Sequence, residues 1–237
     1  MNDGFIDLTV TSPPYDNLRD YKGYSFDFEA IAKELYRVTK IGGVVVWVVS
    51  DATVNGSETG TSFKQALYFK EVGFNLHDTM IWEKRCPPMN AQRYEPAFEY
   101  MFVLSKGKPA IFNGIRTTRI SSDINREKQY HREKDGRKKY NKVKILPVDV
   151  LETNIWKIDN RDISDHPAIF PEKLVKRHIY TWTNKGDLIY DPFTGSGTTM
   201  KMAHLQDRNW IGSEISPEYV ELANKRIKPY LDQLTIF

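Results

Sequence analysis

The sequence predicts an α/β fold: a mainly parallel sheet with helices on both of its faces. Segments with the apolar character of buried strands alternate along the chain with segments of helical spacing, and this alternation is typical of parallel sheets. A glycine-rich turn near residue 195 lies between a strand and a helix, where such sheets bind cofactors. The length of 237 residues suits one large domain or a core with a small insert.

The first half of the chain contains four predicted strands and two predicted helices. The strand at 5–10 stops at two prolines, which cannot continue a central strand. The helix at 28–40 has apolar residues at helical spacing, and we expect the Gly42-Gly43 pair to end it. Val44 to Val49 is β-branched and aromatic throughout, as in a strand buried on both faces. A helix at 62–72 and strands at 75–82 and 99–104 follow.

The second half continues the alternation after a segment that lacks clear periodicity. A short strand or loop is expected at 154–158, and a helix at 171–182 with Pro171 in its first turn. We then expect a strand at 187–190, a helix at 198–206, a strand at 210–213 and a helix at 217–227.

Positive charge is concentrated between Ser105 and Pro147. This segment holds 13 Lys or Arg residues against four acidic ones, so its charge of +9 leaves the rest of the chain at −6 within a net +3. A basic block on an acidic body indicates a polyanionic partner. On charge alone, a solvated surface loop fits equally well.

The turn from Asp191 to Thr198 has the glycines that let a backbone approach a ligand closely. No lysine follows these glycines, so the turn does not match a phosphate-binding P-loop. Gly195 and Gly197 alone are equally consistent with a simple tight turn. About 20 residues later Glu214 ends the next strand. In α/β folds that bind nucleotides, a carboxylate at this position accepts hydrogen bonds from ribose hydroxyls. The pairing of loop and acid predicts a nucleoside cofactor.

The Thr11-Ser12-Pro13-Pro14-Tyr15 turn carries groups that suit methylation of an aromatic amino group, although a rigid turn with no chemical role is the alternative. Such a nitrogen is a poor nucleophile because its lone pair is delocalised into the ring. The Ser12 oxygen and the Pro13 carbonyl can accept its hydrogens, and two prolines hold that carbonyl in place. Tyr15 offers a flat face for stacking an extruded base.

At this point the sequence resembles the amino-methyltransferases of DNA. Residues 11–15 resemble their catalytic motif, in which Asp, Asn or Ser precedes Pro-Pro-Tyr/Phe, and residues 191–199 closely resemble their S-adenosylmethionine motif. Residues 166–171, followed by Leu174 and Arg177, resemble the segment that packs against the methionine part of the cofactor. Residues 93–106 resemble the strand pair before the target-recognition region.

The order of these motifs is similar to that of the permuted class called beta, and it implies a circularly permuted, Rossmann-like methyltransferase sheet. On that resemblance, residues 1–104 form the catalytic half, 105–150 a basic target-recognition insert, and 151–237 the cofactor-binding half. The implied cofactor is S-adenosyl-L-methionine, and the implied partner is double-stranded DNA bound with base flipping.

Site residues follow from the same motifs. The expected catalytic residues are Ser12, Pro13, Pro14 and Tyr15. The expected cofactor-binding residues are Thr11, Phe170, Asp191, Pro192, Phe193, Gly195, Ser196, Gly197, Thr198 and Glu214. The expected DNA-binding residues are Arg116, Arg119, Arg126, Lys128, Arg132, Arg137, Lys138 and Lys139.

Serine at the head of the first motif resembles the enzymes that modify cytosine at N4 more than those that modify adenine at N6, and adenine remains the alternative. Carbon-5 methylation needs a thiolate, and Cys86 lacks the expected Pro-Cys context, so we expect an inert thiol. A methyltransferase that acts on RNA or on protein glutamine is a further alternative. Such enzymes have the unpermuted motif order, with the cofactor loop first, which this chain lacks. A non-catalytic DNA-binding module is a further alternative, which the intact motifs argue against.

Several features of the sequence indicate the cellular location and the partners of the protein. One cysteine excludes a disulfide framework, and no apolar run reaches the ~20 residues that span a bilayer. With no signal-peptide pattern at its start, we expect a cytoplasmic monomer or homodimer without a metal, possibly paired with a cognate restriction endonuclease. Members of the family usually begin with a further strand carrying an acid for the cofactor adenine. Either another residue supplies that contact, or the cofactor affinity is weak, or the natural N-terminus is longer. Asp51 is a candidate pocket residue, although an acid that simply starts a loop is the expected role.

Overall fold

The computed structural model describes residues 1–14, 26–85, 92–118, 130–140, 149–159 and 170–232. Its contacts divide the chain into two compact units. Unit 1 comprises Met1–Asn113 together with Asn154–Phe237, and unit 2 comprises Gly114–Thr153. Residues 105–113, which the sequence assigned to the insert, therefore lie with unit 1.

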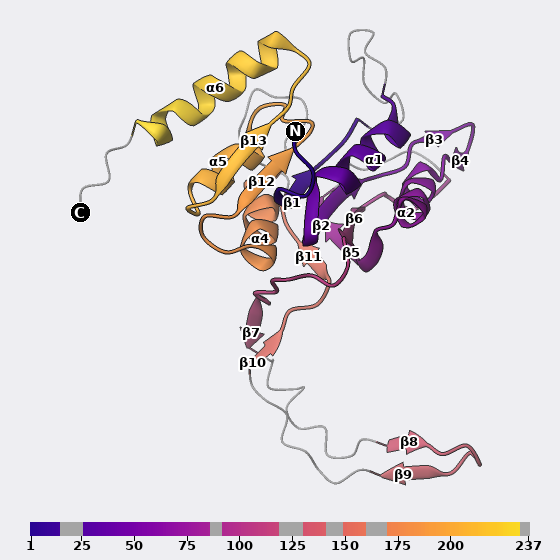
Figure 1. The fold of residues 1–237 in the computed structure, drawn as a ribbon. Helices are drawn as coiled ribbons and strands as arrows, with labels where there is room; N and C mark the ends of the chain where they lie inside the picture. Colours follow the sequence, from indigo (N-terminus) through magenta and orange to yellow (C-terminus); the bar gives the residue numbers. More distant parts are fainter. Residues whose placement is uncertain (15–25, 86–91, 119–129, 141–148, 160–169, 233–237) are drawn as a thin grey trace. The chain divides into compact units, whose positions relative to one another are not determined.

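Unit 1 is built on a seven-stranded sheet in the order β11-β5-β6-β2-β1-β12-β13 (Figure 1). Strand β6 is antiparallel to both of its neighbours, and the other neighbouring strands are parallel. This arrangement confirms the mainly parallel sheet. The strands are β1 (Ile6–Thr11), β2 (Thr39–Val49), β5 (Asn75–Glu83), β6 (Phe98–Ser105), β11 (Ile155–Lys157), β12 (Leu188–Asp191) and β13 (Asn209–Gly212).

Helices cover both faces of this sheet, as expected. Val45, Trp47 and Val49 of β2 pack in a core cluster with residues of α1 and α2. On the opposite face Met101, the register partner of Val48, contacts His178 of α4. The helices are α1 (Phe28–Val38), α2 (Thr61–Val72), α4 (Glu172–Trp182), α5 (Thr198–His204) and α6 (Pro217–Leu231).

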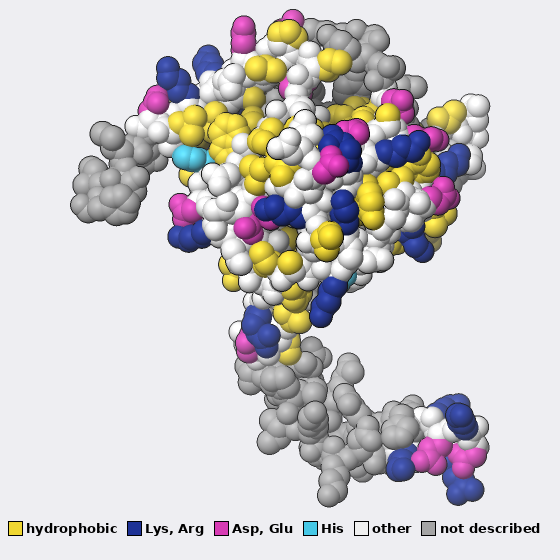
Figure 2. Space-filling model, in the orientation of Figure 1, with side chains coloured by type: hydrophobic (Ala, Val, Ile, Leu, Met, Phe, Trp, Pro, Cys, Tyr) yellow, Lys and Arg dark blue, Asp and Glu magenta, His cyan; other side chains and the backbone are white. Residues whose placement is uncertain are grey.

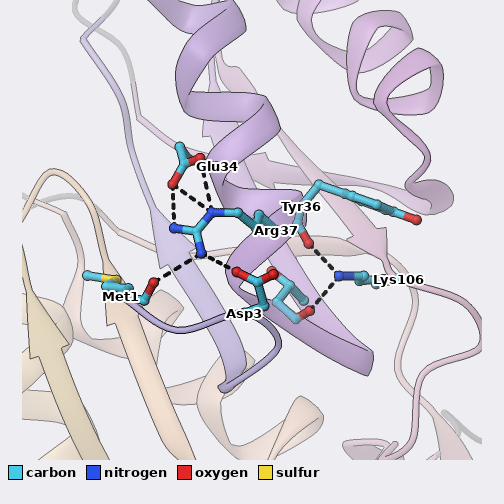
Figure 3. Close-up of polar contacts among 7 residues, drawn as sticks. Met1, Asp3, Glu34, Tyr36, Arg37 and Lys106 are labelled. Carbon is cyan, nitrogen blue, oxygen red and sulfur yellow. Dashed lines mark hydrogen bonds and ion pairs between the residues drawn. The ribbon is translucent and has the colours of Figure 1, made fainter.

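The end of α1 differs from the prediction, because the Gly42-Gly43 pair lies inside β2 and does not end the helix. Thr39 is already extended, with φ −72° and ψ 132°, and pairs with Ile6 of β1. Its hydroxyl donates to the Leu35 carbonyl at 2.6 Å. Lys106 of the loop after β6 donates to two further carbonyls at the helix end (Figure 3). These side chains cap the helix, so no glycine is needed there.

The start of the chain is fastened to α1. The Arg37 guanidinium donates to the Met1 carbonyl at 3.0 Å and contacts the carboxylates of Asp3 and Glu34 (Figure 3). The backbone amide of Phe5 also donates to the Val38 carbonyl at 2.9 Å. These contacts position the entry into β1, the strand that leads to the predicted catalytic turn.

Two other helix ends also differ from expectation. Helix α4 begins at Glu172, so Pro171, whose ψ of 127° is extended, is its N-cap residue and not part of its first turn. Helix α6 continues to Leu231 through Pro229, beyond the expected end at Ile227. Among the described residues, no helix combines the length and the apolar character that crossing a bilayer requires.

Unit 2 contains short antiparallel strands, where the sequence showed no periodicity. Strand β7 (Arg116–Thr118) pairs with β10 (Asp149–Leu151), and β8 (Tyr130–Arg132) pairs with β9 (Lys138–Tyr140). Unit 1 has a further small hairpin of β3 (Thr53–Val54) and β4 (Ser57–Glu58). Strands of three residues are too short to reveal an alternating pattern, which explains why sequence reasoning missed them.

Candidate functional site

The two segments predicted to form the site lie at one edge of the sheet. Strands β1 and β12 are parallel neighbours, with Leu8 opposite Ile189 and Thr9 opposite Tyr190. Because parallel strands have their carboxyl ends on the same edge, the turn at Ser12 and the loop from Asp191 to Thr198 are adjacent. The meeting of these segments, expected from the motif order, is thus observed.

A buried hydrogen bond joins them directly. The Thr11 hydroxyl donates to the Asp191 carboxylate at 2.7 Å, and both side chains are buried. The Phe193 amide donates to the same carboxylate oxygen at 3.0 Å. Burial raises the pKa of the Asp191 carboxyl, against the hydrogen bonds from Thr11, Thr199 and Phe193, which favour the ionised form. Both Thr11 and Asp191 therefore organise the junction of the two segments.

The glycine loop has one open side and one packed side. Gly195 and Gly197 have φ values of +50° and +80°, the left-handed region that favours glycine. A Cβ at Gly195 would meet only the Phe193 carbonyl, at 3.8 Å, so this side of the loop is accessible. A Cβ at Gly197 would lie 3.0 Å from Cβ of Ala223 on α6. A ligand can approach the loop closely at Gly195, whereas Gly197 faces protein.

Glu214 follows β13 and is held by backbone amides of the same region. One carboxylate oxygen accepts from the Gly195 amide at 2.8 Å, and the other accepts from the amides of Ile215 and Ser216 at 2.9 and 3.0 Å. The oxygen that accepts from Gly195 retains a lone pair for a further donor, and the side chain is half-buried. An oriented, partly exposed carboxylate beside an open loop fits recognition of a nucleoside hydroxyl pair.

Gly212, at the end of β13, is a site residue that the sequence analysis did not single out. A Cβ there would lie 2.3 Å from the Thr194 hydroxyl and 2.7 Å from the Met200 sulfur. The absent side chain therefore lets the glycine loop pack against β13. Its position two residues before Glu214 is the one signal in the sequence that points to it.

The remaining predicted site residues occupy varied positions. Pro13 is buried, and Ser12, Pro14, Phe170 and Pro192 are half-buried. The Phe193 ring joins the aromatic core, 5.6 Å from the Phe26 ring and 6.2 Å from the Trp47 ring between centroids. Tyr15, residues 166–169 and Cys86 lie outside the described residues.

Ser196 and Thr198 have partners that the sequence did not predict. The Arg226 guanidinium on α6 donates to both hydroxyl oxygens at 2.9 Å. The same guanidinium donates to Glu172, which also accepts from Lys201. No local motif marks these charged residues, because they come from three separate helices.

Asp51 has a structural role beyond the loop start that was expected of it. Its carboxylate accepts from the Ser62 amide at 2.9 Å, near the start of α2. The N-cap residue of that helix is Gly60, which has no side chain to provide this bond. Asp51 therefore caps α2 from outside the helix.

The predicted DNA-binding residues that are described lie in unit 2, and all of them are exposed. Figure 2 shows basic and acidic side chains together on the β8–β9 hairpin. Arg137 contacts Asp135 at 3.2 Å, and Lys139 contacts Glu133 at 3.1 Å. The described members are Arg116, Arg132, Arg137, Lys138 and Lys139, whereas Arg119, Arg126 and Lys128 lie outside the described residues.

Comparisons with known proteins show the family of this chain. A family model described as DNA methylase, of the N6/N4 type, matches residues 6–225. The chain is 54% identical to the orphan methyltransferase M.BamHII of Bacillus amyloliquefaciens, over 98% of this chain and 92% of that protein.

Two solved structures share the fold. The PvuII DNA methyltransferase, which is cytosine-N4-specific, has a TM-score of 0.67 and 23% identity, covering 94% of this chain and 80% of that one. The M1.HpyAVI–SAM complex has a TM-score of 0.60 and 23% identity, covering 94% and 89%. With the family match and the close relative, these observations establish that the chain belongs to the DNA methylase family whose members modify N6 of adenine or N4 of cytosine.

Proposed function

We propose that this protein transfers a methyl group from S-adenosyl-L-methionine to the N4 amino group of a flipped-out cytosine at a specific site in duplex DNA. The observation that carries the proposal is the Thr11–Asp191 hydrogen bond, which joins the Ser-Pro-Pro turn to the glycine loop. A methyl group can pass directly between a donor and an acceptor only when the two sites are adjacent.

The residues around the glycine loop fit the cofactor. The open side at Gly195 admits a ligand close to the backbone, and the amide-held Glu214 carboxylate is oriented to accept from ribose hydroxyls. Phe170, half-buried immediately before α4, is the proposed contact for the methionine part. S-adenosylmethionine would supply a methyl group activated by its sulfonium charge and leave as the neutral thioether, and the proton displaced from the amino group would pass to water.

The Ser-Pro-Pro turn would make the base nitrogen nucleophilic. The Ser12 oxygen and the Pro13 carbonyl accept the amino hydrogens, which favours a pyramidal nitrogen with its lone pair directed at the methyl group. The two prolines restrict the turn, so these acceptors need little rearrangement. Serine at this position supports cytosine as the target, and the fold shared with a cytosine-N4-specific enzyme is compatible with that choice.

Duplex DNA would be held in part by unit 2. Its exposed Arg and Lys side chains are suited to neutralising phosphates, and this makes binding depend on salt concentration. The relative at 54% identity is an orphan methyltransferase. We therefore infer that this protein also acts without a paired restriction endonuclease.

The decisive experiment identifies the methylated base. Plasmid DNA is incubated with the protein and S-adenosylmethionine, digested to nucleosides and analysed by mass spectrometry. We expect N4-methylcytosine. N6-methyladenine would overturn the choice of base, and the absence of any methylated nucleoside would overturn the proposed activity.

A Ser12→Ala variant tests the role of the turn. Loss of one preorganised acceptor is expected to lower kcat by about 10²–10³-fold, the range typical of such groups, while the Kd for S-adenosylmethionine stays within twofold of wild type. Ser57→Ala, which removes an exposed hydroxyl from the β3–β4 hairpin, is the matched control. An unchanged rate for Ser12→Ala would remove Ser12 from the mechanism.

A further inference from the structure

We propose that Arg226 of α6 is a positioning residue that holds the glycine loop in its ligand-binding shape and thereby sets the affinity for S-adenosylmethionine. This inference rests on the proposed function, because it assigns the loop to the cofactor. Arg226 lies outside every motif that the sequence analysis identified.

The guanidinium of Arg226 binds both residues that flank Gly197. One nitrogen, Nη1, donates to the Ser196 hydroxyl and to the Thr198 hydroxyl, each at 2.9 Å. Because Ser196 belongs to the loop and Thr198 begins α5, one planar group joins the loop to the helix that follows it. A guanidinium suits this task, since its donors are fixed in one plane.

A carboxylate holds the other side of Arg226. Its Nη2 donates to Glu172 Oε1 at 2.6 Å, and the Lys201 ammonium donates to the same oxygen at 2.7 Å. Burial alone raises the pKa of Glu172, but the bonds from Lys201 and Arg226 outweigh it and leave the pKa below its ordinary value. The carboxylate therefore stays ionised at neutral pH and orients Arg226 from α4.

A second contact places the same helix against the loop. Ala223, one turn before Arg226 on α6, lies where a Cβ of Gly197 would come within 3.0 Å. Helix α6 thus supports the loop through close packing at Gly197 and through hydrogen bonds on either side of it. A Cβ at Gly195 would meet no atom of this helix within 4 Å, so that side of the loop remains open.

This arrangement has an energetic consequence for cofactor binding. A free loop with two glycines populates many conformations and loses that freedom when a ligand binds. If Arg226 already selects one conformation, binding of S-adenosylmethionine costs less entropy and the affinity rises. The effect acts on binding, so the chemical step at Ser12 should be nearly independent of Arg226.

The test compares Arg226→Met with Arg226→Lys and with Lys225→Met in the full-length protein. Lys225 is the exposed neighbour on the same helix, so its variant removes the same charge without touching the loop. Calorimetry gives the Kd for S-adenosylmethionine, steady-state methylation of plasmid DNA gives kcat and KM, and urea unfolding without ligand gives stability.

We expect Arg226→Met to raise Kd and the KM for S-adenosylmethionine by about tenfold while kcat changes less than twofold, a loss of about 1.4 kcal/mol in binding. Arg226→Lys should recover part of the affinity, and Lys225→Met should match wild type. A Kd for Arg226→Met within twofold of Lys225→Met would overturn the inference. So would a fall in kcat as large as the rise in KM.

A Ser196→Ala variant provides a second test of the inference if Arg226→Met does not fold. It removes one hydroxyl that receives Arg226, and we expect a Kd about threefold above wild type; an unchanged Kd counts against the inference. In a folded double variant, adding Ser196→Ala to Arg226→Met should cause no further loss. Failure of wild-type protein to bind S-adenosylmethionine would instead refute the proposed function.

Discussion

The glycine loop and the β8–β9 hairpin are held in opposite ways. The loop is fixed by side chains remote in sequence, including Thr11, Glu214 and Arg226. Among the described residues, the ion pairs of the hairpin, by contrast, join residues of the hairpin itself, such as Asp135 with Arg137. The difference matches the two tasks proposed for them: methyl transfer demands a fixed geometry, whereas attraction to phosphates tolerates many arrangements of charge.

The largest effect on cofactor binding is expected from a substitution at Gly197 of the glycine loop. In Gly197→Asp, a side chain must adopt φ near +80° and enter the space occupied by Ala223. We expect no detectable binding of S-adenosylmethionine by calorimetry and a loss of stability of at least ~1 kcal/mol in urea.

Gly186→Asp is the matched control for that variant. Gly186 has a similar φ of +85°, but nothing lies within 4 Å of its Cβ position. It should show backbone strain without loss of cofactor binding. Normal binding by Gly197→Asp would show that the loop is less constrained than its packing indicates.

A smaller effect is expected from removing charge on the hairpin. Changing Arg137, Lys138 and Lys139 together to Ala should weaken DNA binding by roughly tenfold at moderate salt and flatten the dependence of log K on log salt concentration. The Kd for S-adenosylmethionine should not change. Fluorescence anisotropy over a series of salt concentrations measures both the affinity and the slope.

Exposed lysines of unit 1 provide the control for this triple variant. They carry the same total charge, so their loss tests for a non-specific effect of net charge. The control variant changes Lys64, Lys70 and Lys225 to Ala. Equal losses in the two triple variants would contradict a specific role for the hairpin.

The smallest effect concerns the pH dependence of stability in unit 1. Burial, with the nearby Arg177 charge, lowers the pKa of His178 to about 3. In the unfolded chain this histidine has an ordinary pKa of about 6.5 and is protonated below that pH, whereas in the folded chain it stays neutral. The free energy of unfolding therefore falls as the pH drops from about 6.5 towards 3. This group should contribute a loss of about 0.7 kcal/mol between pH 7 and pH 6.

His178→Phe keeps a ring beside Trp156 and removes the titrating group. Urea unfolding at pH 7 and pH 6 should show a flatter dependence for this variant than for wild type. Equal slopes would mean that His178 accepts its proton in the folded protein. The hairpin residues of described burial, 132–139, are all exposed, so no comparable buried group occurs among them.

Sequence reasoning succeeded where the determining interactions are local. The turn of Gly195 and Gly197 and the spacing to Glu214 follow from strand and loop lengths, and the structure brings the Gly195 amide and the Glu214 carboxylate together as this spacing suggests. The order of the motifs also predicted that Ser12 and this loop would meet, and the pairing of β1 with β12 agrees.

Sequence reasoning failed where the role of a residue depends on its partners in the tertiary structure. The Gly42-Gly43 pair looked like a helix stop, but Thr39 and Lys106 end that helix with their side chains. Arg226 has no signature, because its importance arises only when α6 packs beside Ser196. The short strands of unit 2 left no periodic signal, since three residues cannot establish alternation.

The central place of β1 has a consequence for how the protein is made. Of the strands of this sheet β1 is synthesised first, yet the partner of one of its two edges, β12, follows only about 180 residues later. At a synthesis rate of about 5–20 residues per second, that edge has no native partner for roughly 10–40 s. The proposed methyl-transfer site is therefore completed late in synthesis, and a nascent chain that ends before β12 lacks half of it.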